Sequence, residues 1–267
     1  MTNTTAIRVA GISKIFRRAG LETHALASID LDIGAGDFVS IVGPSGCGKS
    51  TMLRLVAGLL APSTGHVEIL GRKVTGPVTE LGIVFQSPVL LDWRTLLDNV
   101  LAQIELRGHR PDAYRQRAID LLAAVGLAGF EDRYPHELSG GMRQRAQIVR
   151  ALIHDPPLLL MDEPFGALDA LTREQMRLDL EALWLAQPKT VLFITHSIDE
   201  AVLLSDRVVV MSERPGRIDR ILDIDLPRPR GLEARQSAGF DAATNTITEI
   251  FLSRGILRRG SILQPKA

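Results

Sequence analysis

Several features are scarce or absent in this sequence of 267 residues, and each absence narrows the possibilities. The single cysteine, Cys47, excludes an internal disulfide and fits a reducing compartment. The formal net charge is zero, from 31 basic and 31 acidic residues, so the chain has no overall positive field to hold a phosphate backbone. We therefore expect no nucleic-acid partner.

Targeting signals and membrane spans are absent too. The first residues, "MTNTTAIRVAGIS", have neither the basic region nor the apolar region of a secretory signal. No uncharged apolar run reaches the roughly 20 residues of a membrane-spanning helix. We expect a chain that is made and kept in the cytoplasm. Heptads, internal repeats and low-complexity tracts are also missing.

What is present is an alternation of strand and helix patterns. Several apolar stretches lack polar alternation, as expected of strands that are covered on both faces. Helical patterns separate them, which is typical of a mainly parallel sheet. The expected strands are 27–33, 38–42, 81–85, 158–162 and 190–195, with two more within 206–211 and 217–226. The expected helices are 49–60, 95–107, 112–125, 140–154, 172–187 and 198–204.

The order of these patterns also predicts a division of the chain. Between about 95 and 154 the patterns are helical with no convincing strand, which indicates a helical insertion within an α/β core. A Pro-rich break at 226–231 precedes a short helical tail. The expected parts are an α/β core (1–94 and 155–226), a helical subdomain (95–154) and a C-terminal helical tail (227–267).

A glycine-rich stretch, "SIVGPSGCGKSTML" at 40–53, follows one of the expected strands. It fits G-x-x-x-x-G-K-[ST], a loop whose backbone N–H groups converge on phosphate oxygens at the positive N-terminus of a helix. Lys49 would reach the β- and γ-phosphates, and Ser50 would hold Mg²⁺. The alternative is a tight turn, but the strand before and the helix after favour phosphate binding. The expected nucleotide-binding residues here are Gly43, Pro44, Ser45, Gly46, Cys47, Gly48, Lys49, Ser50 and Thr51, and bound nucleotide is expected to shield Cys47 from alkylation.

Two carboxylates end another strand pattern, in "LLLMDEP" at 158–164. Ligands of open α/β folds bind at this edge of the sheet. Asp162 is therefore expected to hold Mg²⁺ through water, and Glu163 to polarise the attacking water. The alternative is an acidic cap on the strand exit, but the glycine loop in the same chain favours the metal site.

A second possible anion site is "LSGGMRQR" at 138–145. Ser139 can cap the helix that follows, and the glycines expose backbone N–H groups. In isolation this motif could be only a helix start.

Together these motifs resemble those of ATP-binding cassette (ABC) ATPases, and the resemblance extends to about residue 226. It includes the Q-loop glutamine Gln86, the D-loop "ALD" at 167–169 and the switch histidine His196. The resemblance implies an α/β fold with a P-loop NTPase core, a mainly parallel sheet, an N-terminal antiparallel β subdomain and the inserted helical subdomain.

The resemblance also implies an ATP hydrolase with ATP and Mg²⁺ as cofactors. Gln86 and His196 would join Glu163 as catalytic residues, with His196 at the γ-phosphate. Gln86 would join Ser50 and Asp162 around the metal. Taken alone, His196 at a strand end would be an ordinary loop histidine.

Two such subunits are implied to pack head to tail, with the signature of one copy closing over ATP that is held on Lys49 of the other. One glycine loop and one signature per chain require a second copy or a paralogue, and a homodimer is the simpler expectation. The residues that would act across this interface are Ser139, Gly140, Gly141 and Asp169.

Two positions depart from the commonest pattern of the family. Met142 stands where the signature usually has Gln, which leaves Ser139 and the glycines intact. Phe16 occupies the place of the aromatic residue, often Tyr, that stacks on adenine. Phe keeps the aromatic face, and the alternative for Phe16 is a role in the core.

The segments "VFQSPVLLDWRTLLDNV" (84–100), "RPGRI" (214–218) and "DLPRPR" (225–230) resemble importer ATPases of the nitrate, sulfonate, taurine and bicarbonate group. This resemblance implies a peripheral subunit on the cytoplasmic face of the inner membrane. Its partners would be a membrane permease and, through that permease, a solute-binding protein. The transported solute would be a small anion or a related small organic compound.

The region after Gln86 is implied to receive a coupling helix of the permease. Leu90, Leu91 and Trp93 are the expected contacts, and burial of the two leucines is the alternative. An exposed Trp would be harder to explain without a partner.

Three other functions compete with this interpretation. A soluble cassette ATPase of DNA or ribosomes lacks support, because coiled coils and a second cassette are missing. An exporter ATPase shares the catalytic motifs and differs only in the importer-like segments. A P-loop kinase leaves "LSGGM" unexplained. The tail's "RGILRRG" (254–260) fits a solvated helix end or a contact with lipid or permease.

Overall fold

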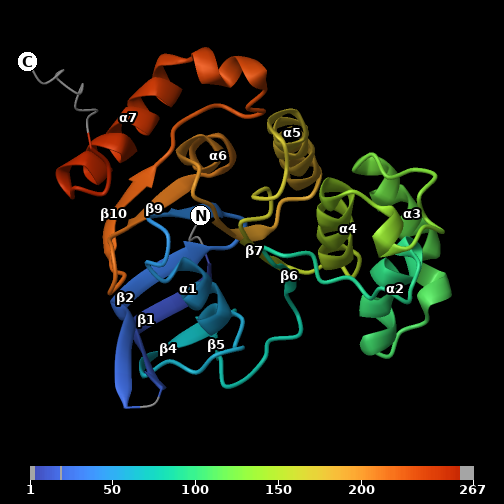
Figure 1. Ribbon diagram of the computed structural model, residues 1–267, viewed down its shortest axis with the longest axis horizontal. Coiled ribbons are helices and arrows are strands. Elements are labelled where there is room, and N and C mark those ends of the chain that lie inside the picture. Colours follow the sequence, from blue (N-terminus) through green and yellow to red (C-terminus); the bar gives the residue numbers. More distant parts are fainter. Residues whose placement is uncertain (1–3, 19, 259–267) are drawn as a thin grey trace, which may run out of the picture.

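A computed structural model describes residues 4–18 and 20–258 of the chain (Figure 1). At its centre lies a six-stranded sheet with the order β10-β9-β3-β8-β7-β6. The inner strands are parallel, and β10 pairs antiparallel with β9 at one edge. The mainly parallel sheet expected from the sequence is therefore confirmed. Its strands are β3 (Phe38–Val42), β6 (Gly82–Val84), β7 (Leu158–Asp162), β8 (Thr190–Ile194), β9 (Arg207–Met211) and β10 (Ile218–Asp223).

A second, antiparallel sheet has the order β2-β1-β4-β5. In β2 the side chains of Ile29, Leu31 and Ile33 are buried between exposed neighbours, as the period-two pattern predicted. The core between the two sheets holds the helix α1 (Lys49–Val56), which packs against both of them (Figure 1). The strands of this sheet are β1 (Thr5–Arg18), β2 (Leu21–Gly34), β4 (Thr64–Ile69) and β5 (Arg72–Lys73).

The segment between β6 and β7 is helical and lies at one end of the central sheet (Figure 1). It comprises α2 (Leu96–Leu106), α3 (Arg115–Ala124) and α4 (Gly140–Leu152), with short 3₁₀ helices at Pro111–Tyr114 and Pro135–Glu137. These helices share a hydrophobic cluster that includes Val100, Leu122 and Val149. A separate cluster is what an inserted subdomain needs, and it supports the proposed division at 95–154.

The remaining helices cover the other face of the central sheet (Figure 1). They are α5 (Ala170–Ala186), α6 (Ile198–Leu204) and α7 (Ala238–Ser253), with a 3₁₀ helix at Leu232–Gln236 before α7. Phe240, Ile247 and Phe251 of α7 are buried in one cluster with residues of α6 and β9. Within the described part of the chain, no helix has the length and apolarity that a membrane span requires.

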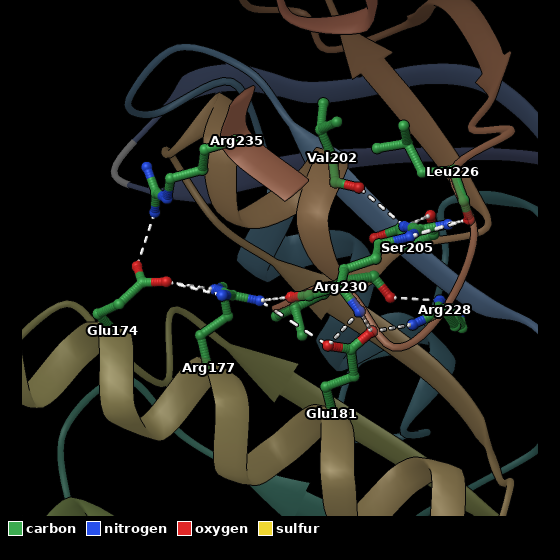
Figure 2. Close-up of polar contacts among 10 residues, drawn as sticks. Glu174, Arg177, Glu181, Val202, Ser205, Leu226, Arg228, Arg230 and Arg235 are labelled. Atoms are coloured by element: carbon green, nitrogen blue, oxygen red, sulfur yellow. Dashed lines mark hydrogen bonds and ion pairs between the residues drawn. The ribbon is translucent and has the colours of Figure 1, made fainter. Parts of the chain in front are cut away.

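The Pro-rich segment before α7 is anchored by a group of charged residues, which we call the arginine cluster (Figure 2). It consists of the buried Arg177 and Glu181 of α5, the buried Arg230 and the partly buried Arg228. The two carboxylate oxygens of Glu181 accept hydrogen bonds from the backbone N–H of Arg230 at 2.9 and 3.0 Å. Arg228 Nη1 donates to the same carboxylate at 3.2 Å. Arg177 Nη1 donates to the carbonyl oxygen of Arg230 at 2.8 Å. The Pro-rich segment 226–231 is therefore held in a fixed position by these hydrogen bonds.

Arg230 is 1% exposed, as is Arg177 of the same cluster. Arg230 Nη1 donates to the carbonyl oxygens of Val202 and Ser205 at 2.8 and 2.7 Å, at the C-terminal end of α6. A cation at this end also complements the negative pole of the helix. Burial lowers the pKa of Arg230 from 12.5 to about 10. The hydrogen bonds are what make so deep a charge tolerable.

Residues at the end of the described chain are also tied to the fold. Arg254 Nη2 and Nε bind the carboxylate of Asp219, on β10, at 2.5 and 2.8 Å. Part of the basic segment 254–260, at residues 259 and 260, lies outside the described residues.

Candidate functional site

The glycine loop connects β3 to α1, as predicted. Its backbone requires glycine at two points: Gly46 has φ +75°, and Gly48 has φ +109°. A Cβ at Gly48 would lie 2.9 Å from the backbone carbonyl oxygen of Ala25, so a larger residue would be strained there. Lys49 Nζ donates to the carbonyl oxygens of Gly43 at 2.7 Å and Pro44 at 3.1 Å. The loop thus curls around the lysine, as a phosphate-binding loop does.

A cavity of about 530 Å³ opens over this loop. Its floor is formed by Ser45, Gly46, Gly48, Lys49, Ser50 and Thr51. Phe16 of β1 forms part of its wall and is 39% exposed, which favours the stacking role over a role in the core. The remaining wall residues are Gln86, Glu163, His196, Thr23, Ala25 and Arg214. The volume suits a nucleotide-sized ligand.

The two carboxylates at the end of β7, Asp162 and Glu163, have different partners. Asp162 is 4% exposed, and its Oδ1 accepts a hydrogen bond from Ser50 Oγ at 2.9 Å. Burial raises the pKa of Asp162, and the nearby Glu163 adds to this rise. Glu163 has φ +46°, a strained conformation for a residue other than glycine. Its backbone N–H donates to the carbonyl oxygen of Ile194 at 2.8 Å, so the turn is held at the end of the sheet.

Glu163 is the meeting point of the expected catalytic residues. Gln86 Nε2 donates to Glu163 Oε2 at 3.0 Å, and His196 Nδ1 lies 3.4 Å from the same oxygen. These three side chains come from the ends of β6, β7 and β8, which are neighbours in the parallel sheet. The carboxyl ends of adjacent parallel strands meet at one edge, which is why distant residues converge here.

The position of His196 is fixed by its neighbours at the start of α6. Thr195 Oγ1 accepts a hydrogen bond from Ser197 N at 3.0 Å and donates to the buried Glu200 carboxylate. Ser197 caps the helix by accepting from Glu200 N at 3.3 Å. Burial raises the pKa of Glu200.

The side-chain oxygen atoms of Ser50 and Asp162 are suitable ligands for Mg²⁺. In proteins, Mg²⁺ is usually bound by one or two protein oxygens together with phosphate oxygens and water. The buried carboxylate with a raised pKa gains from a cation beside it. Within residues 4–18 and 20–258, no cluster of three or more His, Cys, Asp or Glu side chains forms a metal site without a ligand.

Several expected residues do not line the cavity. Gly43 and Pro44 contribute carbonyl oxygens to Lys49 instead. The Cys47 thiol is 1% exposed, and burial raises its pKa. Protein atoms already cover this thiol, so we expect little alkylation with or without nucleotide, in contrast to the expectation from the sequence.

The signature and the D-loop lie outside the cavity within one chain. Ser139 caps α4 by accepting a hydrogen bond from Met142 N at 3.2 Å. Asp169 caps α5 by accepting from Thr172 N at 3.0 Å, and this bond lowers the pKa of Asp169. The residues that surround the cavity include none of Ser139, Gly140, Gly141 and Asp169.

The structure adds Thr23, Ala25 and Arg214 to the site. Arg214 Nε and Nη2 both donate to the carbonyl oxygen of Gly46, at 3.1 and 2.9 Å. The motif "RPGRI" contains Arg214, but nothing in the local pattern indicates that it lies beside the glycine loop.

The central parallel sheet, the glycine loop and the carboxylates at the strand ends define a nucleoside-triphosphate hydrolase of the P-loop class. The family model described as "ABC transporter" matches residues 26–166. The chain is 49% identical to an uncharacterized ABC transporter ATP-binding protein of Methanocaldococcus jannaschii. The 224 aligned residues cover 84% of each protein. The chain therefore belongs to the ABC transporter family, and it is an ABC-type ATPase.

Other relatives carry more specific names. An aliphatic sulfonates import ATP-binding protein of Bacillus cereus is 39% identical over 253 residues, which cover 94% of this chain and 98% of that protein. A taurine import ATP-binding protein of Rhizobium johnstonii is 48% identical over 211 residues, covering 79% of this chain and 80% of that protein.

A solved structure shows the same fold. It is the dimeric structure of an ATP-binding cassette in a post-hydrolysis state with bound ADP and phosphate. Its TM-score is 0.75 at 32% sequence identity, over 83% of this chain and all of that one.

Proposed function

We propose that this chain is the ATP-hydrolysing subunit of an importer for a small sulfonate, taurine-like or related anion. The observation that carries the proposal is the similarity to the aliphatic sulfonates import protein, which spans 98% of that protein's length. Related small organic solutes remain within the proposed class, because selectivity would reside in the permease and in a solute-binding protein.

The partner surface follows Gln86. Trp93 is 74% exposed and Val89 is 53% exposed, which is unusual for large apolar side chains. Leu90 packs partly against the helical cluster, so it joins the partner surface less fully than Trp93 does. The loop that carries Trp93 is rigid and presents the indole to solvent, which suits docking of a permease helix.

That rigidity comes from Asn99, a fully buried polar residue of α2. Its Oδ1 accepts from Leu91 N at 2.7 Å. Its Nδ2 donates to the carbonyl oxygens of Leu91, Arg94 and Thr95, each at 3.0 Å. One side chain of α2 therefore holds both ends of the turn that carries Trp93.

The functional unit is proposed to be a homodimer. Ser139, Gly140, Gly141 and Asp169 lie away from this chain's own cavity, so they are free to complete the cavity of a second copy. The dimeric cassette with ADP and phosphate supports this arrangement by its fold.

In hydrolysis, Lys49 exchanges its loop carbonyls for the β- and γ-phosphates, while Phe16 stacks on adenine. Glu163 accepts a proton from the attacking water, and Gln86 and His196 hold its carboxylate in place. Bound Mg²⁺, held by Ser50, Asp162 and Gln86, would neutralise charge on the phosphate oxygens. ATP would bind the closed dimer more tightly than the open one, which shifts the permease between conformations.

The proposed location is the cytoplasmic face of the inner membrane. The test is purification of the tagged chain from gently solubilised membranes, with mass spectrometry of the proteins that co-purify. A multi-span permease in stoichiometric amount is the expected result. Recovery alone, or with ribosomes or DNA-associated proteins, would contradict the importer role and leave the ATPase standing.

Trp93→Ala sharpens this test. It should lower permease recovery on the order of tenfold, because a Trp that becomes buried when a partner binds is a typical interface hot spot. ATP hydrolysis by the isolated chain should stay unchanged. The control is Leu232→Ala, an apolar residue that is 59% exposed before α7. Equal recovery with Trp93→Ala and wild type would place the docking surface elsewhere.

A further inference from the structure

The loop between β9 and β10 is packed against the glycine loop, although the two are far apart in sequence. The backbone of Gly216 pairs with β2: its N–H donates to Ala25 and its carbonyl oxygen accepts from Ala27, both at 3.0 Å. A Cβ at Gly216 would lie 2.1 Å from the carbonyl oxygen of Cys47, so only glycine allows this approach. The loop is thereby fixed between the strand that borders the cavity and the glycine loop itself.

This fixed loop places Arg214 at the edge of the nucleotide cavity. The paired hydrogen bonds of Nε and Nη2 to Gly46 hold the guanidinium in one orientation. Within residues 4–18 and 20–258, no carboxylate lies within ion-pair distance of Arg214. Its positive charge is therefore not neutralised by the described part of the protein.

We propose that Arg214 is a further nucleotide-binding residue of this ATPase. It has two effects: it fixes the Gly46 carbonyl oxygen, which keeps the loop N–H groups turned toward the phosphates, and it adds a positive charge beside the polyphosphate. An arginine whose charge is unpaired and whose planar guanidinium is held in one orientation is well suited to bind phosphate. The ligand class is a nucleoside di- or triphosphate.

The experiment measures the Kd of ADP and ATP by titration calorimetry, and the kinetics of ATP hydrolysis, for wild type and three variants. Arg214→Gln should raise both Kd values on the order of tenfold, because it removes a charge-assisted contact. KM for ATP should rise in parallel, with kcat within about twofold of wild type, since the contact is the same before and during reaction.

Arg214→Lys keeps the charge but not the fork, and it should give Kd values between those of wild type and Arg214→Gln. Arg217→Gln is the matched control: it removes a charge from the same loop at an exposed residue that does not line the cavity. Its Kd values should equal those of wild type.

Three outcomes would overturn the proposal. The first is an Arg214→Gln protein with Kd values within twofold of wild type. The second is equal weakening by Arg217→Gln, which would assign the effect to the general charge of the loop. The third is an Arg214→Lys protein no better than Arg214→Gln, which would contradict the proposed contribution of a positive charge beside the polyphosphate.

Discussion

Lys49 and Arg230 are both buried cations that donate to backbone carbonyl oxygens, yet they serve different purposes. Lys49 is 5% exposed and has two carbonyl acceptors, and it faces the cavity of about 530 Å³. Arg230 is 1% exposed, and all three of its guanidinium nitrogens have acceptors inside the protein. The cavity, and not burial or charge, distinguishes a binding group from a structural one.

The same contrast applies to the carboxylates around them. Glu163 is approached by two side chains, Gln86 and His196, for which we propose catalytic roles of their own. Glu181 is contacted by the three arginines of the arginine cluster and is 3% exposed. Changes at the nucleotide site should therefore affect ATP chemistry, and changes in the arginine cluster should affect folding. Three predictions test whether the two regions separate in this way, and a fourth concerns a residue outside both.

The largest expected effect is on hydrolysis. Glu163→Gln should lower the rate of ATP hydrolysis by roughly 10²–10⁴-fold, because the amide cannot accept the proton of the attacking water. The Kd of ATP should stay within a few-fold of wild type, because the amide preserves the shape of the site. The measurement is single-turnover hydrolysis together with calorimetry. Hydrolysis at the wild-type rate would show that another group is the base.

Glu181→Gln should have the largest effect on folding. It removes the carboxylate that Arg177 and Arg228 share. Glu174 and Asp206 still pair with the two arginines, so we expect a loss of about 1.5–3 kcal/mol of unfolding free energy. Denaturant unfolding measures this cost. The control is Glu22→Gln, whose partner Arg17 is a surface residue with a side chain that is 77% exposed. That exposed pair contributes about 1 kcal/mol or less. Similar losses in both variants would contradict the importance of burial.

Lys49→Ala should weaken ATP binding roughly 10- to 100-fold, because it removes a charge-assisted hydrogen bond to the phosphates. Calorimetry gives the Kd, and Lys73→Ala, at an exposed lysine of β5, is the matched control. An unchanged Kd in Lys49→Ala would mean that the cavity over the glycine loop is not the nucleotide site.

The smallest effect concerns His154, which belongs to neither region. Burial, with a smaller contribution from Arg107, lowers its pKa from 6.5 to about 4. Asp155 and Lys189 are the other charged groups that act on it. Because the unfolded chain binds the proton more readily, the free energy of unfolding should fall as pH drops from 6.5 to about 4.

His154→Gln should remove this part of the acid sensitivity, since Gln can still accept a hydrogen bond from Arg107 without titrating. As pH falls from 6.5 to about 4, the unfolding midpoint of the variant should rise by a few degrees relative to that of wild type. His109→Gln, at an exposed histidine, is the control. A constant difference between variant and wild type at every pH would contradict the role of His154.

Much of the central sheet could be predicted, because its strands are short apolar runs between helices. The strands at 38–42 and 158–162 were predicted with the bounds that the structure has. β1 was not, because Gly11, with φ +55°, interrupts its alternation and shifts the register with β2. The helix at 49–60 ends at Val56, before Gly58 takes a left-handed conformation.

The candidate site followed from the sequence where its residues form local motifs with known geometry. Lys49, Ser50, Asp162 and Glu163 belong to this group. Arg214 could not be found in this way, since its contact with Gly46 joins residues 168 positions apart. The arginine cluster was missed for the same reason. Contacts of this kind depend on how the loops pack, which local patterns do not encode.

Thermal unfolding of Lys49→Ala and Glu181→Gln, each with and without MgATP, tests the separation of the two regions most directly. A ligand that binds only the folded state stabilises it by RT ln(1 + [L]/Kd), so the rise in the midpoint shrinks when the Kd rises. Glu181→Gln should unfold at a lower temperature than wild type and keep the full rise with MgATP. Lys49→Ala should unfold near the wild-type temperature and lose most of the rise. The reverse pattern, or loss of the rise in both variants, would contradict the assignment of the nucleotide site.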